Sequence, residues 1–180
     1  MENDFFALLQ QTKQKGELAA LEESNKKTEK FGLSLTREQA GELVICRNES
    51  LKKYKRVEFG EGILNKLIFI FCDSQYIDVN NYLETLEKLQ DIFYAFKNET
   101  QDKMTDDELL TFMREQYEKV CFGDLEYLGT TCLERYAKAV REGYSGYLQS
   151  QGQGEYERFS EEERWDSELY YDVLKELFWG

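Results

Sequence analysis

The segment that decides the fold lies at residues 80–97 and reads NNYLETLEKLQDIFYAFK. Its large apolar side chains recur every three or four residues, which is the period of an amphipathic α-helix. They form one stripe, made of Tyr82, Leu86, Leu89, Phe93 and Phe96. Glu84 and Lys88 are spaced for an i,i+4 ion pair, which stabilises a helix further. The segment therefore predicts a helix with one buried face.

Three further helices have a recognisable start. In a capping box, a Ser or Thr side chain accepts the backbone N–H three residues later, and a Glu or Gln there reaches back to the cap. The pattern occurs three times, as Thr36 with Gln39, Thr105 with Glu108, and Ser160 with Glu163. These pairs predict helices that begin near residues 36, 105 and 160.

The remaining apolar segments also favour helices. Residues 63–72 fit either a strand or a buried helix, and we prefer the helix because no partner strand is evident elsewhere. Another helix is expected over residues 125–143. The chain contains no proline, so it lacks the residue that most often kinks a helix. The predicted fold is all-α, a compact bundle of six or seven helices.

The first helix is expected over residues 3–21. Its core contacts are predicted to be Phe5, Leu8, Leu9 and Leu18, and Gly16 is a candidate break. The polar stretch that follows, residues 22–30, suits either a frayed extension of this helix or a loop.

A stretch rich in glycine, serine and glutamine at residues 143–154 is typical of a flexible linker. We therefore divide the chain into a helical domain (1–142), a linker (143–159) and a C-terminal amphipathic helix (160–180). This last helix is expected to dock on its own core, on a protein partner, or on a second copy by domain swapping. Its candidate anchors are Trp165, Leu169, Tyr170, Val173 and Leu177.

The chain is acidic, with 36 Asp+Glu against 23 Lys+Arg and a net charge of -13. Residues 1–60 are nearly balanced, with 11 Lys+Arg against 10 Asp+Glu, so the acidity belongs to the rest of the chain. Nucleic acids and anionic membranes are bound through Lys and Arg, and neither is an expected partner. An acidic start and the absence of a long apolar run predict a cytoplasmic protein.

The residue types needed for several kinds of catalytic or metal site are missing. The chain has no histidine, which removes the imidazole base and His-bearing metal sites. Its four cysteines show no CxxC spacing and are expected to be reduced and buried. The acidic run at residues 106–108 suits the first turn of a capped helix better than a metal site. We therefore predict no catalytic residue, cofactor or metal.

One polar cluster departs from the helical pattern. Arg47 falls on the apolar side of the helix that begins near residue 36, where a guanidinium needs a carboxylate or carbonyl partner. The candidate cluster consists of Arg47, Asn48, Arg56, Glu58, Lys66 and Asp73. A structural Arg–carboxylate bridge is the favoured interpretation, and a pocket for a small anion is the alternative.

Several motifs in residues 35–97 resemble a known family. They are LTREQA at 35–40, RNESL at 47–51, EFGEGI at 58–63 and FCDSQYI at 71–77. They are similar to an uncharacterised bacterial family, found mainly in anaerobic Gram-positive bacteria and catalogued as a domain of unknown function. The resemblance extends to about Arg141, and it implies no activity, cofactor or partner.

The sequence thus favours a small acidic protein that binds another protein and has no catalysis of its own, with a homodimer also open. One alternative is a small-ligand binder or enzyme that uses the polar cluster between Arg47 and Asp73. A second alternative is an acidic decoy that sequesters a basic nucleic-acid-binding protein.

Overall fold

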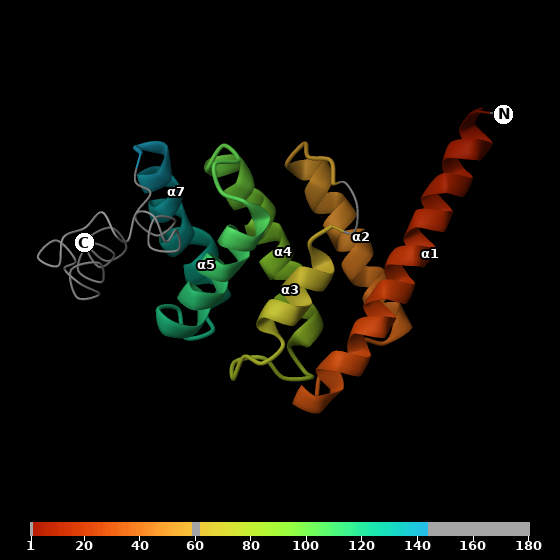
Figure 1. The fold of residues 1–180 in the computed structure, drawn as a ribbon, viewed down its shortest axis with the longest axis horizontal. Helices are drawn as coiled ribbons and strands as arrows, with labels where there is room; N and C mark the ends of the chain where they lie inside the picture. Colours follow the sequence, from red (N-terminus) through yellow and green to blue (C-terminus); the bar gives the residue numbers. More distant parts are fainter. Residues whose placement is uncertain (1, 59–61, 144–180) are drawn as a thin grey trace, which may run out of the picture.

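The computed structural model describes residues 2–58 and 62–143, and over these residues the fold is all-α without any strand (Figure 1). The first five α-helices are α1 (Glu2–Thr28), α2 (Arg37–Lys53), α3 (Leu64–Phe71), α4 (Tyr82–Glu99) and α5 (Asp106–Lys119). The final helical stretch consists of α6 (Leu125–Tyr127), one π-helical turn η2 (Leu128–Cys132) and α7 (Leu133–Arg141). A short 3-10 turn, η1 (Glu29–Phe31), follows α1. The predicted fold class is confirmed.

Two of the three capping boxes are confirmed. Thr36 accepts the N–H of Gln39 at 3.1 Å, and the Gln39 side chain accepts the N–H of Thr36 at 3.0 Å. Thr105 and Glu108 make the same reciprocal pair, at 3.2 and 2.9 Å. Each box satisfies two N–H groups that would otherwise lack a partner at the start of its helix. The third predicted box, and the whole C-terminal helix, lie outside the described residues.

Helix α4 lies at the centre of the described fold. It contacts α2, α3, α5, α6 and α7, and Figure 1 shows it between α2 and α5. All five side chains of its predicted stripe are buried, and Glu84 pairs with Lys88 at 2.8 Å. The sequence pattern therefore identified both this helix and the face that it buries.

Residues 64–71 form a helix, as expected. Leu64, Leu67, Ile68 and Phe71 of α3 are buried, and the helix contacts α1, α4 and α5. Helix α3 thus connects α1 with α4 and α5.

The expected regular helix over residues 125–143 contains a π-helical turn. Gly129 lies in this turn, and a Cβ atom placed there would come within 3.0 Å of Ile92 Cγ1. The close approach of α4 therefore leaves little room for a side chain at position 129.

Helix α1 is continuous, so the candidate break at Gly16 does not occur. Of the two alternatives for residues 22–30, the extension of the helix is the one formed, as far as Thr28. The predicted core contacts of its first half were wrong, because Phe5, Leu8 and Leu9 are exposed. Only Leu18 packs against the core, beside the buried Leu21.

The four cysteines form no disulfide: Cys72, Cys121 and Cys132 are buried, and Cys46 is half-buried. Burial raises the pKa of the Cys46 and Cys72 thiols, so both favour the protonated form. No described helix is both long and apolar enough to cross a lipid bilayer.

Candidate functional site

Arg47 is buried at the junction of α1, α2 and the segment after α2, with a relative exposure of 2%. Its Nη2 donates to Glu17 Oε2 at 2.7 Å, and its Nη1 donates to Glu58 Oε1 at 3.0 Å. The Nε donates to Asn48 Oδ1 at 3.1 Å. One guanidinium therefore holds together two carboxylates that come from segments far apart in the sequence.

The second oxygen of Glu58 accepts a hydrogen bond from the hydroxyl of Tyr94, which is buried on α4. Burial raises the pKa of Glu58, and the positive charge of Arg47 opposes this effect. Gly62 allows the arrangement, because a Cβ there would lie 1.8 Å from Glu58 Oε1. Its φ of +70° is also a conformation that glycine adopts without strain.

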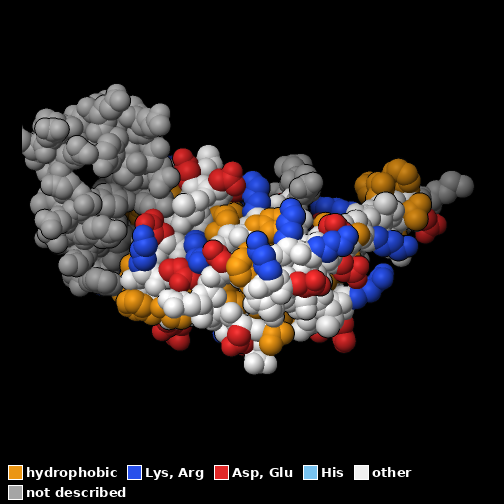
Figure 2. Space-filling model, turned by 60° about the horizontal axis from the view of Figure 1, so that its bottom comes forward, with side chains coloured by type: hydrophobic (Ala, Val, Ile, Leu, Met, Phe, Trp, Pro, Cys, Tyr) orange, Lys and Arg blue, Asp and Glu red, His pale blue; other side chains and the backbone are white. Residues whose placement is uncertain are grey.

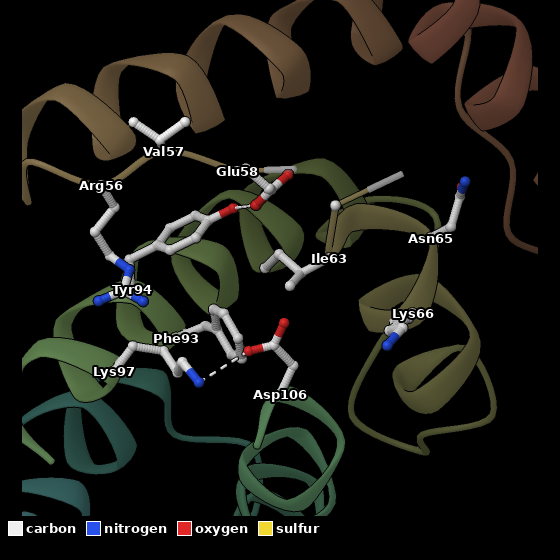
Figure 3. Close-up of a pocket in the computed structure, with 11 residues that line it drawn as sticks. Arg56, Val57, Glu58, Ile63, Asn65, Lys66, Phe93, Tyr94, Lys97 and Asp106 are labelled. Atoms are coloured by element: carbon white, nitrogen blue, oxygen red, sulfur yellow. Dashed lines mark hydrogen bonds and ion pairs between the residues drawn. The ribbon is translucent and has the colours of Figure 1, made fainter. Parts of the chain in front are cut away.

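A cavity of about 490 Å³ lies beside Glu58, on the side of Tyr94 (Figure 3). Its lining includes Arg56, Glu58, Ile63, Lys66, Tyr94 and Lys97. Figure 3 shows Glu58 meeting Tyr94 along one side, and Lys97 paired with Asp106 across from them. A cavity of this size can hold a small molecule.

Every cation that lines this cavity has a carboxylate partner. The pairs are Arg56 Nη2 with Asp102 Oδ1 at 2.6 Å, Lys66 Nζ with Asp107 Oδ1 at 3.0 Å, and Lys97 Nζ with Asp106 Oδ1 at 3.0 Å. Lys97 also donates to the carbonyl oxygen of Met104 at 2.7 Å. The cavity therefore presents paired charges, with no strong excess of either sign. One buried acceptor that borders it, Asn65 Oδ1, has no hydrogen-bond partner.

The structure brings together only part of the predicted polar cluster. Arg47, Asn48 and Glu58 are in contact, whereas Arg56 and Lys66 line the neighbouring cavity. Asp73 lies elsewhere, where it accepts from Arg114 Nη1 at 2.6 Å.

Sequence reasoning missed Glu17, Tyr94 and Lys97. Tyr94 and Lys97 belong to a helix that the sequence did predict, but they flank its stripe, and periodicity alone does not mark them. Glu17 precedes Arg47 by thirty residues, and no local pattern connects the two.

The part of α1 before Glu17 is a second candidate site. Every residue from 3 to 16 is exposed, and Figure 1 shows this half of α1 extending beyond the other helices. We call residues 3–16 the arm. The ion pair between Glu17 and Arg47 lies where the arm leaves the rest of the fold, so it anchors the base of the arm.

The arm carries four large apolar side chains. Phe5, Phe6, Leu8 and Leu9 have relative exposures of 61%, 63%, 60% and 49%. The rings of Phe5 and Phe6 meet edge to face, with centroids 6.3 Å apart. Figure 2 shows hydrophobic side chains gathered near the end of this projecting helix.

Three of these side chains share one face with Thr12. Phe5, Leu8 and Leu9 are spaced three and four residues apart, and Thr12 continues the row by one further turn. The Thr12 hydroxyl donates to the Leu8 carbonyl at 2.9 Å, so its hydrogen-bonding need is met inside the helix. The face is therefore apolar over two turns.

None of the described residues forms a group of three or more Cys, Asp or Glu side chains placed to hold a metal ion. The predicted C-terminal anchors, from Trp165 to Leu177, lie outside the described residues. The arm and the cavity beside Glu58 are thus the two candidate sites that the structure describes.

Comparison with protein-family models matches residues 20–146 to a family described as "Family of unknown function (DUF6323)". The matched range begins after the arm and includes Arg47, Glu58 and the cavity. Comparisons with curated proteins and with solved structures find no match.

Proposed function

The chain belongs to this family of unknown function, which brings no activity with it, and we propose that the protein binds another polypeptide through the apolar face of its arm. The observation that carries the proposal is the exposure of Phe5, Phe6, Leu8 and Leu9 on one projecting helix. Contiguous apolar patches on a protein surface mark sites of interaction. Amphipathic helices are commonly bound in this way, with the apolar face in contact with a partner.

Every residue of the arm is exposed, so tertiary burial contributes little to the stability of its helix. An isolated helix of this length is only marginally stable in water. Burial of the apolar face against a partner would stabilise the helix and remove the exposed rings from water. The partly buried ion pair between Glu17 and Arg47 supports the proposal further, because it holds the base of the arm in place.

The test is affinity capture from native lysate with the full-length tagged protein. Leu8→Asp places a charge in the centre of the apolar face, and it should lower the recovery of a specific partner at least about tenfold. Gln14→Asp is the matched control, because it adds the same charge to an exposed position of the arm on the opposite side of the helix. A partner recovered equally by all three proteins would refute binding through the arm.

A second candidate function is the binding of a small anionic molecule in the cavity beside Glu58. The cavity volume of about 490 Å³ and the presence of Arg56, Lys66 and Lys97 in its lining favour this role. An anion would compete with Asp106 and Asp107 for these cations. A panel of small carboxylates and phosphates should then raise the melting temperature, and Lys66→Ala should reduce that increase.

The acidic-decoy alternative gains no support from the visible surface. Figure 2 shows Lys and Arg side chains interspersed with Asp and Glu on this face of the molecule. A decoy for a nucleic-acid-binding protein would instead present a continuous acidic surface.

A further inference from the structure

We propose that the partner of the arm is the arm of a second copy of this chain, packed antiparallel to the first. The inference rests on the proposed function, since it uses the same apolar face and names what covers it. Self-association through one identical patch gives a closed two-fold dimer.

The apolar face is self-complementary when two arms run in opposite directions. Centring the pair between Leu8 and Leu9 brings Leu8 of one copy beside Leu9 of the other. The same arrangement places Phe5 against Thr12, whose hydroxyl is already satisfied within its own helix. Each bulky ring therefore meets a small residue, which allows the helices to approach closely.

The charges of the arm select this orientation. Asp4 and Lys15 are eleven residues apart, or about three turns, so they lie on the same flank of the apolar face. In an antiparallel pair each flank meets its own counterpart running the other way. In the register above, Asp4 of one copy lies level with position 13 of the other, and Lys15, on the matching flank, is about 3 Å further along the axis. The long Lys15 side chain spans this offset, so Asp4 of one copy pairs with Lys15 of the other, twice per dimer. A parallel pair would bring like charges together. Within the described residues, neither side chain forms an ion pair.

The length of the arm fits the same geometry. The exposed segment runs from residue 3 to residue 16 and spans about 20 Å at 1.5 Å per residue. An antiparallel overlap centred between Leu8 and Leu9 uses nearly all of this length. It leaves the two folded bodies at opposite ends of the paired arms, where they do not obstruct each other.

The available area predicts a weak dimer. Phe5, Leu8 and Leu9 are 49–61% exposed, so they offer roughly 300 Å² of side-chain surface per copy. Two copies together bury less than the roughly 1,200 Å² typical of a stable complex. The dimer should therefore be weak, with a dissociation constant of roughly tens to hundreds of micromolar.

The experiment is sedimentation equilibrium of the full-length protein over a range of concentrations. Wild type and Gln14→Asp should dimerise equally, and Leu8→Asp should raise the dissociation constant about tenfold or more. Asp4→Lys and Lys15→Asp should each weaken the dimer about fivefold, because each variant sets like charges against one another. The double variant D4K/K15D restores opposite charges, so it should dimerise more tightly than either single variant.

Recovery of dimerisation by the double variant distinguishes self-association from binding to a different protein. In a different protein, the charges that face the arm would stay the same when the charges of the arm are exchanged. A protein that stays monomeric at all concentrations would overturn the inference, as would a dimer that Leu8→Asp leaves intact. In each of these cases, a partner captured by wild type and lost with Leu8→Asp would still support the proposed function.

Discussion

Arg47 shows how far a single residue can be interpreted from sequence. Its place on the apolar side of a helix predicted burial and a need for carboxylate partners, and the structure provides both. Glu58 was among the candidate partners because it lies nearby in the chain. Glu17 was not, because only the packing of α1 against α2 brings it within 2.7 Å.

Arg47→Ala should destabilise the fold by about 3 kcal/mol, because it leaves Glu17 and Glu58 largely buried without their cation. Arg37→Ala is the control, since Arg37 is exposed on the same helix and its loss should cost no more than about 0.5 kcal/mol. Urea denaturation of the two variants measures both changes. Equal stabilities would show that Arg47 contributes no more than a surface arginine.

Gly62→Ala tests whether Glu58 can hold its position only because residue 62 has no side chain. Gly62 and Gly32 both have a left-handed φ, +70° and +75°, but only Gly62 has a close neighbour. Alanine at either position should cost about 1 kcal/mol for the backbone conformation. Gly62→Ala should cost at least about 2 kcal/mol more, because Glu58 must move away from Arg47 and Tyr94. Thermal unfolding of both variants compares them, and equal losses would contradict the observed packing.

At the scale of the element, α1 contains two apolar faces that point in different directions. Phe5 and Leu8 lie about 140–160° around the helix from Leu21, at roughly 100° per residue. A straight helix that buries Leu21 therefore cannot bury Phe5 and Leu8 against the same neighbours. The sequence interpretation grouped Phe5, Leu8, Leu9 and Leu18 as one set of core contacts. It was wrong because it counted apolar residues without considering the direction in which each one projects from the helix axis.

Gly16→Ala should stabilise α1 where the arm begins. The helix passes through Gly16, and no atom lies within 4 Å of the position that a Cβ would take. Alanine there should gain about 0.5–1 kcal/mol of local helix stability, since glycine is a poor helix former. Amide hydrogen exchange of the flanking residues should become slower. Unchanged exchange would indicate that the chain is not helical at this position in solution.

At the scale of the whole molecule, burial falls from α4 outwards to the arm. Helix α4 contacts five other helical segments, whereas the arm has no buried residue. Local stability follows the number of such contacts, because opening a segment exposes only what it buries.

Hydrogen exchange of the full-length protein should therefore proceed in a definite order. The amides of residues 3–16 should exchange first at low protein concentration, and those in the centre of α4 should exchange only on global unfolding. Mass spectrometry of peptic fragments can measure both. An arm protected as strongly as α4 in dilute solution would contradict this order.

The sequence by itself determined the elements that depend on local chemistry. Capping boxes, helical periodicity and the absence of proline act within a few residues, and they were sufficient to predict the all-α fold, the starts of α2 and α5, and the buried face of α4. They were also sufficient to mark Arg47 as a residue in need of a partner.

Only the tertiary structure decided what depends on the relative placement of helices. It brought Glu17 to Arg47 and Tyr94 to Glu58, it placed Asp73 with Arg114, and it left residues 3–16 of α1 exposed. The energy of a contact between distant segments depends on the phase and packing of both, and neither is encoded in a local pattern. The two candidate sites of this protein, the arm and the cavity beside Glu58, arise from that placement.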